Sequence, residues 1–145
     1  MNIGQIASQL AVTVSVGATL EDAAAEMLSH GVGTLIVTKL WEGRASVAGI
    51  LTDRDIVRAR LQHTSALSAL DVADVMTLDP LIIDADESIP NAIRHLKARS
   101  VRRAPVVTRD GTLLGVISTD DLIREIAEQL GALAQLVARQ GSQGS

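Results

Sequence analysis

The chain contains the same pattern twice, and this internal repeat constrains its fold more than any other feature. Residues 3–6 (IGQI) are echoed by 72–75 (VADV), and residues 19–23 (TLEDA) by 88–92 (SIPNA), each 69 positions later. Residues 49–55 (GILTDRD) are echoed by 115–121 (GVISTDD), now 66 positions later. The three-residue difference falls in one connection, 39–46 in the first repeat and 108–112 in the second. Two such copies usually form one pseudo-symmetric structure.

Length and composition favour one compact domain, or two small halves that share a core. The chain has 145 residues, of which 47% are hydrophobic, and this suffices for a packed interior. It contains one Trp but no Tyr or Phe, so aliphatic side chains must build the core. The aromatic platforms on which many nucleic-acid binders stack bases are therefore missing. The net charge of −4 also disfavours nucleic acid, although the cluster of Arg99, Arg102 and Arg103 is able to meet a phosphate.

Several other kinds of site are disfavoured by what the sequence lacks. Without cysteine there are no disulfides, no thiolate nucleophile and no cysteine-based metal site. His30, His63 and His95 share no ligand spacing, so no metal site is expected. No apolar run approaches the roughly 18 residues of a membrane helix, and the N-terminal residues do not resemble a signal peptide. We therefore expect a soluble, cytoplasmic protein.

Each repeat predicts the order strand, helix, strand, strand, helix, and hence an α/β (α+β) fold. Thr19 and Ser88 are candidate N-caps, each followed by apolar residues at helical spacing. Second helices are expected to begin at Asp53 and Asp120. Asp110-Gly111 predicts a tight hairpin turn, whereas the matching residues 41–44 predict a longer and looser loop. Buried strands are expected at 34–38, 47–51, 104–108 and 113–117, with short additional strands at 12–14 and 81–83.

The repeats divide the chain into five parts. These are the first repeat (3–59), a linker with room for a helical turn (60–71), the second repeat (72–125), a C-terminal helix extension (126–140) and a flexible tail (141–145). The extension continues the apolar spacing of the last helix and exposes more apolar surface than one module covers. It therefore predicts either a dimer contact or a docking surface for another protein.

The turns that follow the last strand of each repeat carry the clearest chemical signal. Thr52 is followed by Asp55, and Ser118 by Asp121, each pair at the start of a helix. The free N–H groups of such a turn suit a phosphate, and a carboxylate beside them suits the hydroxyls of a ribose. Gly49 and Gly115, just upstream, are interpreted as letting a flat ligand approach the backbone. Both pairs are equally explained as helix capping boxes, but their occurrence in both repeats favours ligand binding.

From about Ile3 to Glu125 the chain resembles a stand-alone tandem CBS-domain protein, a family named after cystathionine β-synthase. The motifs that carry this resemblance are the two Gly-x-x-(Thr/Ser)-x-x-Asp signatures, Val75-Met-Thr-x-x-Pro80 and Arg102-Arg103-Ala-Pro-Val106. The resemblance implies that two small sheets meet about a pseudo-twofold axis and leave two clefts. It also implies that these clefts bind adenosine compounds, namely AMP, ADP, ATP, NAD or S-adenosylmethionine.

The resemblance further implies roles for particular residues. Asp55 and Asp121 contact ribose, Thr52 and Ser118 add hydroxyl contacts, and the turn residues Asp53, Arg54, Thr119 and Asp120 complete the ligand sites. The adenine is lined by Val12, Thr13, Val14, Leu81, Ile82 and Ile83. Arg102 and Arg103 hold phosphate, and because Gly33 and Thr34 replace them in the first repeat, one cleft is expected to bind better. The alternatives are a solvated basic turn for this arginine pair and an exposed position for Arg54.

The leading hypothesis is a non-catalytic regulatory module that acts as a homodimer. Adenosine ligands would change the arrangement of the repeats, and a regulated protein that the sequence does not identify would respond. No nucleophile–base pair is apparent, so neither enzyme activity nor a required cofactor is expected. The alternative is a dimerisation or scaffold module with vestigial clefts, in which Asp55→Ala and Asp121→Ala affect stability alone. RNA or DNA binding is a weaker third hypothesis, and membrane association is not expected.

Overall fold

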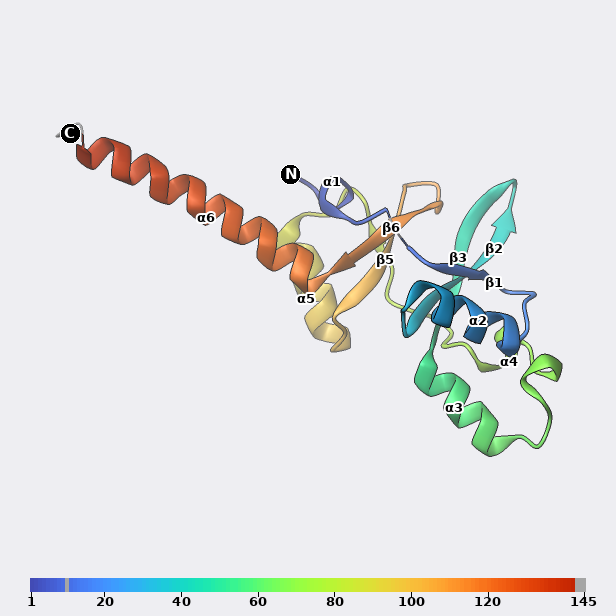
Figure 1. Cartoon of the computed structure of the whole chain (residues 1–145). Helices are drawn as coiled ribbons and strands as arrows, with labels where there is room; N and C mark the ends of the chain where they lie inside the picture. The colour runs from blue at the N-terminus through green and yellow to red at the C-terminus, as the bar shows by residue number, and fades with distance from the viewer. Residues whose placement is uncertain (10, 143–145) are drawn as a thin grey trace.

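The computed structural model describes residues 1–9 and 11–142 and contains two three-stranded sheets, each accompanied by helices (Figure 1). The strand orders are β1-β2-β3 and β4-β5-β6, so the internal repeat of the sequence is also a repeat of topology. This confirms the mixed α/β fold and the long C-terminal helix. The elements are α1 (Ile3–Ile6), β1 (Thr13–Ser15), α2 (Leu20–His30), β2 (Thr34–Trp41), β3 (Arg44–Thr52), α3 (Asp53–Gln62), η1 (Leu67–Ala69), α4 (Val72–Val75), β4 (Ile83–Asp84), α5 (Ile89–Arg99), β5 (Arg103–Val107), β6 (Leu113–Ser118) and α6 (Thr119–Ser142).

Local signals explain where the helices of each repeat begin and end. Thr19 accepts a hydrogen bond from the Asp22 backbone and closes a capping box at the start of α2. Gly31 ends this helix in the left-handed conformation, at a φ of 63°. Ser88 caps α5 in the same way by accepting from the Asn91 backbone. Within each sheet the first strand runs parallel to the second and the second antiparallel to the third. Each repeat thus folds in the predicted order.

The connection between β2 and β3 differs from the predicted loose loop. The two strands continue until Trp41 pairs with Arg44, and only Glu42 and Gly43 form the turn. Both turn residues have positive φ, 50° and 77°, which is the requirement of a type I′ hairpin turn. The three additional residues of the first repeat therefore lengthen a hairpin instead of loosening it. Sequence analysis missed this turn because Glu rarely occupies such a conformation.

The tip of this hairpin is tied to the turn of the other repeat. Arg44 forms an ion pair with Asp110, and Ser46 forms a β-bridge with Thr112. Hydrogen bonds from Thr108 and Thr112 to the Asp110 carboxylate, with Arg44 nearby, hold the pKa of Asp110 well below its usual value. The Asp110 side chain is thus both the organiser of its own turn and a contact between the two sheets.

The two hydrophobic cores do not follow the boundaries of the sequence repeats. Ile3 of α1 is fully buried in the core of the second repeat, beside Ile83 and Ile117. Val72 of α4 is fully buried in the core of the first repeat, beside Leu20. The residues 3–6 and 72–75 that the repeat marked thus form short helices that are exchanged between the two halves. We call α1 and α4 the exchanged segments.

After each exchanged segment the chain crosses a strand of the other repeat at a glycine. Ser8 exchanges two backbone hydrogen bonds with Val116, both of 2.9 Å, and Thr77 exchanges two with Ile50, of 2.8 and 3.2 Å. A Cβ on Gly115 would lie 2.2 Å from the Ser8 carbonyl oxygen, and one on Gly49 would lie 2.7 Å from that of Thr77. The interpretation that Gly49 and Gly115 let a flat ligand approach the backbone is therefore wrong, because the backbone of Thr77 and Ser8 occupies that space.

Replacement of Gly115 by Ala is expected to lower the free energy of unfolding by about 1–3 kcal/mol. The added methyl group overpacks a site where the neighbour is backbone and has no flexible end to move aside. Gly17→Ala is the matched control, because a Cβ there meets only Ser15 Oγ, at 3.8 Å. Urea unfolding of both variants measures the difference. Equal stability of the two variants would contradict the close crossing at Gly115.

Candidate functional site

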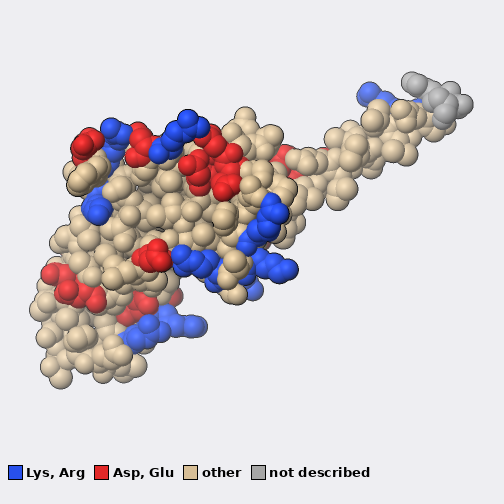
Figure 2. Space-filling model, turned by 180° about the vertical axis from the view of Figure 1, so that it is seen from behind, with Lys and Arg blue, Asp and Glu red and all other residues tan. Residues whose placement is uncertain are grey.

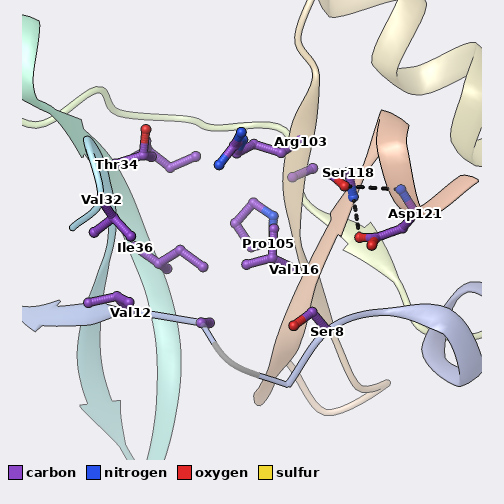
Figure 3. A pocket seen from close by; sticks show the side chains of 13 residues that line it. Ser8, Val12, Val32, Thr34, Ile36, Arg103, Pro105, Val116, Ser118 and Asp121 are labelled. Carbon is purple, nitrogen blue, oxygen red and sulfur yellow. Dashed lines mark hydrogen bonds between the residues drawn. The ribbon is translucent and has the colours of Figure 1, made fainter. Parts of the chain in front are cut away.

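A cleft of about 280 Å³ lies where β2 of the first repeat faces β5 and β6 of the second (Figure 3). Its size is near the lower end of the roughly 300–1,000 Å³ typical of small-molecule sites. We call it the Asp121 cleft. It is lined by Ser8, Ala11, Val12, Val32, Thr34, Ile36, Ile50, Arg103, Ala104, Pro105, Val116, Ser118 and Asp121.

The Asp121 cleft combines apolar walls with a polar end. Val12 and Ile36 lie on one side and Pro105 and Val116 on the other, as Figure 3 shows. Ser118 and Asp121 lie together where β6 passes into α6, and Arg103 extends from β5 toward Thr34 of β2. Aliphatic surfaces on both sides suit a flat, mostly apolar group. The hydroxyl, carboxylate and guanidinium groups suit a polar substituent attached to it.

Ser118 and Asp121 form a capping box at the start of α6. The Ser118 backbone donates to Asp121 Oδ2 at 3.0 Å, and the Asp121 backbone donates to Ser118 Oγ at 3.2 Å. Asp121 Oδ1 lies 3.5 Å from Arg124 Nη1, and 19% of the side-chain surface remains exposed. The capping alternative is therefore correct for this pair. Because both residues also line the cleft, capping and ligand binding are compatible.

Thr52 and Asp55 form the corresponding capping box at the start of α3. The Thr52 backbone donates to Asp55 Oδ2 at 2.9 Å, and the Asp55 backbone donates to Thr52 Oγ1 at 3.2 Å. Only 11% of the Asp55 side chain is exposed, and Oδ1 faces Arg58 at 3.5 Å. Neither Thr52 nor Asp55 lines the Asp121 cleft or its counterpart described below. The two predicted sites are thus unequal in the described structure.

The counterpart is a cleft of about 260 Å³ that we call the Asp79 cleft. Arg103 lines it as well as the Asp121 cleft, so one guanidinium borders both. Arg99 donates two hydrogen bonds of 3.3 Å to the Asp79 carbonyl at this cleft. Its lining residues are Ile50, Thr77, Leu78, Asp79, Pro80, Leu81, Arg99, Val101 and Arg103. Thr34 is the residue of the first repeat that corresponds to Arg103 of the second. The positive charge of Arg103 therefore has no equivalent at this position of the first repeat.

The other residues predicted to bind ligand lie in several places. Val12 lines the Asp121 cleft and Leu81 the Asp79 cleft, whereas Val14 and Ile83 are buried in the two cores. Thr13, the first residue of β1, and Ile82, just before β4, are exposed. Asp53 and Thr119 line apolar grooves on the helical side of the molecule. Outside both clefts, and exposed, are Arg54, Arg102 and Asp120.

Sequence analysis missed much of the cleft lining because it comes from strand positions without reactive side chains. Ser8, Thr34, Ile36, Pro105 and Val116 were not singled out for binding. The repeat contained a signal that finds them, since the offset of 69 pairs Ser8 with Thr77 and Thr34 with Arg103. Once a residue is known to line one cleft, the repeat therefore predicts that its equivalent lines the other.

Two further observations concern residues 1–9 and 11–142. No group of three or more His, Cys, Asp or Glu side chains in this part of the chain is arranged to hold a metal ion. None of its helices is both long and apolar enough to cross a lipid bilayer.

A tandem repeat of two α/β halves with clefts at their junction defines the class of this protein. The sequence model of the CBS domain matches residues 3–62 and 72–128. The chain therefore belongs to the CBS-domain family, as a CBS pair, and the resemblance noted in the sequence is confirmed.

The chain is similar to two longer, uncharacterized proteins. It is 29% identical over 126 residues to an uncharacterized 17.7 kDa protein of Acidianus ambivalens, a match that covers 87% of this chain and 73% of that protein. It is 23% identical over 124 residues to an uncharacterized protein of Methanopyrus kandleri, with 86% of this chain and 62% of the other covered. The chain thus spans somewhat less than two thirds of the Methanopyrus protein.

Solved structures share the fold over most of the chain. Hypoxic Response Protein I with two coordinated zinc ions is 27% identical, with a TM-score of 0.71 and coverage of 86% of this chain and 98% of that one. CBSX2 in complex with AMP is 24% identical, with a TM-score of 0.71 and coverage of 88% and 96%. The CBS domain pair of protein MJ0100, in complex with methylthioadenosine and S-adenosylmethionine, is 19% identical, with a TM-score of 0.69 and coverage of 89% and 98%.

Proposed function

We propose that this CBS pair is a regulatory module that binds an adenosine-containing ligand in the Asp121 cleft. The observation that carries the proposal is the placement of Ser118, Asp121 and Arg103 around one apolar slot between the repeats. The AMP complex of CBSX2 and the adenosine-compound complex of MJ0100 support this class of ligand. AMP, ADP, ATP, NAD and S-adenosylmethionine all contain the required group.

Each part of the ligand has a chemical counterpart in the cleft. The adenine ring lies between aliphatic side chains such as Val12 and Pro105, since the chain has no Tyr or Phe to stack on it. Asp121 accepts hydrogen bonds from the ribose hydroxyls, through the carboxylate surface that capping leaves exposed. Arg103 pairs with a phosphate, a contact that charge on both partners strengthens.

The proposed role is to signal and not to catalyse. The walls of the Asp121 cleft come from both repeats, so a ligand that contacts both favours one relative position of the two sheets. It shifts that equilibrium only by its difference in affinity for the two arrangements. A homodimer would pass the change to a regulated protein, and no cofactor is needed for this role. The Asp79 cleft, which lacks an aspartate capping pair in its lining, is the weaker of the two sites in this proposal.

A thermal-shift panel with AMP, ADP, ATP, NAD, NADH, S-adenosylmethionine and GTP as the guanine control tests the proposed function. A ligand at 100 times its dissociation constant adds roughly 2.7 kcal/mol of stability, which raises the melting temperature by several degrees. A shift confined to adenosine compounds is the expected result. The protein is first shown to be free of ligand retained from its expression host.

A scaffold module with vestigial clefts is the second candidate function. It is favoured by the two capping boxes, which account for Asp55 and Asp121 without any ligand. This candidate predicts no thermal shift with any compound of the panel. That outcome, in folded and ligand-free protein, would overturn the sensor proposal.

A further inference from the structure

The second half of α6 projects from the rest of the protein and exposes its apolar side chains (Figure 1). Leu122, near the start of the helix, is buried in the second core, whereas the C-terminal half of α6 extends away from both sheets. Leu130, Leu133 and Val137 are 62%, 59% and 66% exposed. An isolated helix of this length is only marginally stable in water, and apolar packing normally supplies the remainder of its stability. The exposed apolar side chains therefore indicate that something covers this helix.

The spacing of these side chains identifies the kind of surface that covers them. Ile123, Ile126, Leu130, Leu133 and Val137 follow one another at intervals of three, four, three and four residues, and we call them the heptad stripe. This is the a and d spacing of a coiled coil, in which a second helix packs against the first. The stripe thus predicts a helix as its partner and not a flat surface.

From Ile123 onward, the charges of α6 avoid the heptad stripe and its flanks. With Ile123 at position a, the charged residues Arg124, Glu125, Glu128 and Arg139 all occupy the outer positions b, c and f. The flanking e and g positions hold Ala127, Gln129, Ala134 and Leu136, none of which is charged. Figure 2 shows the projecting helix without charge along most of its length, with basic side chains only near its far end. A matching partner helix must therefore be equally uncharged at its own flanks.

We propose that the partner is α6 of a second copy of this chain, packed in parallel. A second copy has an identical apolar stripe with identical uncharged flanks, so a twofold axis makes the surface self-complementary. Because the stripe covers only about two and a half heptads, fewer than a self-sufficient coiled coil needs, the contact must extend beyond it.

The base of α6 provides that extension. Ile123 and Ile126 also line an apolar groove between α5 and α6, together with Ile93, Leu96 and Val101. Parallel packing places the grooves of both copies at the same end and brings them together. Antiparallel packing would instead set the polar last turn, around Arg139, against this groove. The parallel arrangement therefore buries the larger apolar surface. This inference is independent of any ligand in the clefts.

Disulfide trapping in the full chain tests the parallel arrangement, and the absence of native cysteine makes single substitutions unambiguous. Val137→Cys lies at position a, where parallel helices bring equivalent residues together. Ala138→Cys, at the outer position b, is the matched control. Under mild oxidation we expect at least tenfold more cross-linked dimer from Val137→Cys. Equal cross-linking of the two variants would overturn the parallel pairing.

A charge-insertion pair tests whether the stripe associates at all. Leu130→Glu combined with Leu133→Glu puts charge on the stripe, and because both side chains are exposed in the single chain, each half still folds. Gln135→Glu adds charge at position f and is the control. In sedimentation equilibrium we expect the double variant to have half the mass of the control assembly. A monomeric parent chain, or equal mass for both variants, would overturn the proposal.

Discussion

Arg103→Ala is expected to weaken the binding of AMP about 10- to 100-fold. The reason is the loss of a hydrogen bond between two charged groups, which contributes about 1.5–3 kcal/mol. Arg103 is the residue to change because its side chain lines the Asp121 cleft and borders the Asp79 cleft as well. Isothermal titration calorimetry of the full chain measures the loss.

Two matched controls make this experiment specific. Arg102→Ala removes the same charge one residue earlier, from a side chain that lines neither cleft, and should change affinity less than twofold. Adenosine, which has no phosphate, should bind equally well to the parent chain and to Arg103→Ala. Equal losses in the two arginine variants would show that net charge, and not a phosphate contact at Arg103, determines affinity.

Asp121→Ala is expected to weaken AMP binding about tenfold or more, whereas Asp55→Ala should leave it nearly unchanged. Both aspartates close capping boxes with similar distances, so each substitution should cost about 0.5–2 kcal/mol of stability. Of these two aspartates, only Asp121 lines either cleft, so only its loss removes a hydrogen-bond acceptor from the ligand. Urea unfolding and calorimetry on the same two variants separate the effects.

The pair of aspartate variants also discriminates between the two functions considered above. A scaffold with vestigial clefts loses stability in both variants and shows no ligand response in either. A loss of affinity in Asp55→Ala as large as in Asp121→Ala would place the ligand at the first repeat instead. Asp55 is nine-tenths buried behind its capping contacts, and this is why we expect the opposite.

The regular elements were predictable because their signals are local. Thr19 and Ser88 cap the helices that their sequences predict, and the apolar runs around Ile36 and Val106 form the strands. The β2–β3 turn was not predictable from composition, because Glu42 adopts a positive φ that this residue type rarely shows. The strands that flank it impose that conformation through their pairing.

The candidate site was only partly predictable, because a cleft is made of contacts between distant residues. The spacing of the sequence revealed both pairs, Thr52 with Asp55 and Ser118 with Asp121. Which pair lines a cleft depends on burial and position in the fold, and the spacing does not specify either. The glycines illustrate the same limit. Gly115 signalled a close approach, but that the Ser8 backbone makes this approach follows only from the exchange of segments between the halves.

The exchanged segments make each half of the chain dependent on the other for a complete core. In a single copy of the repeat, the opening helix has no core to pack against. The core of that copy lacks the helix that would complete it. Two separate copies satisfy each other by the same crossing that Ile3 and Val72 make here, but only when they meet in solution. The tether of residues 60–71 replaces that encounter with a fixed, high local concentration. A contact that two separate copies could make only on meeting is thus built into the architecture of one chain.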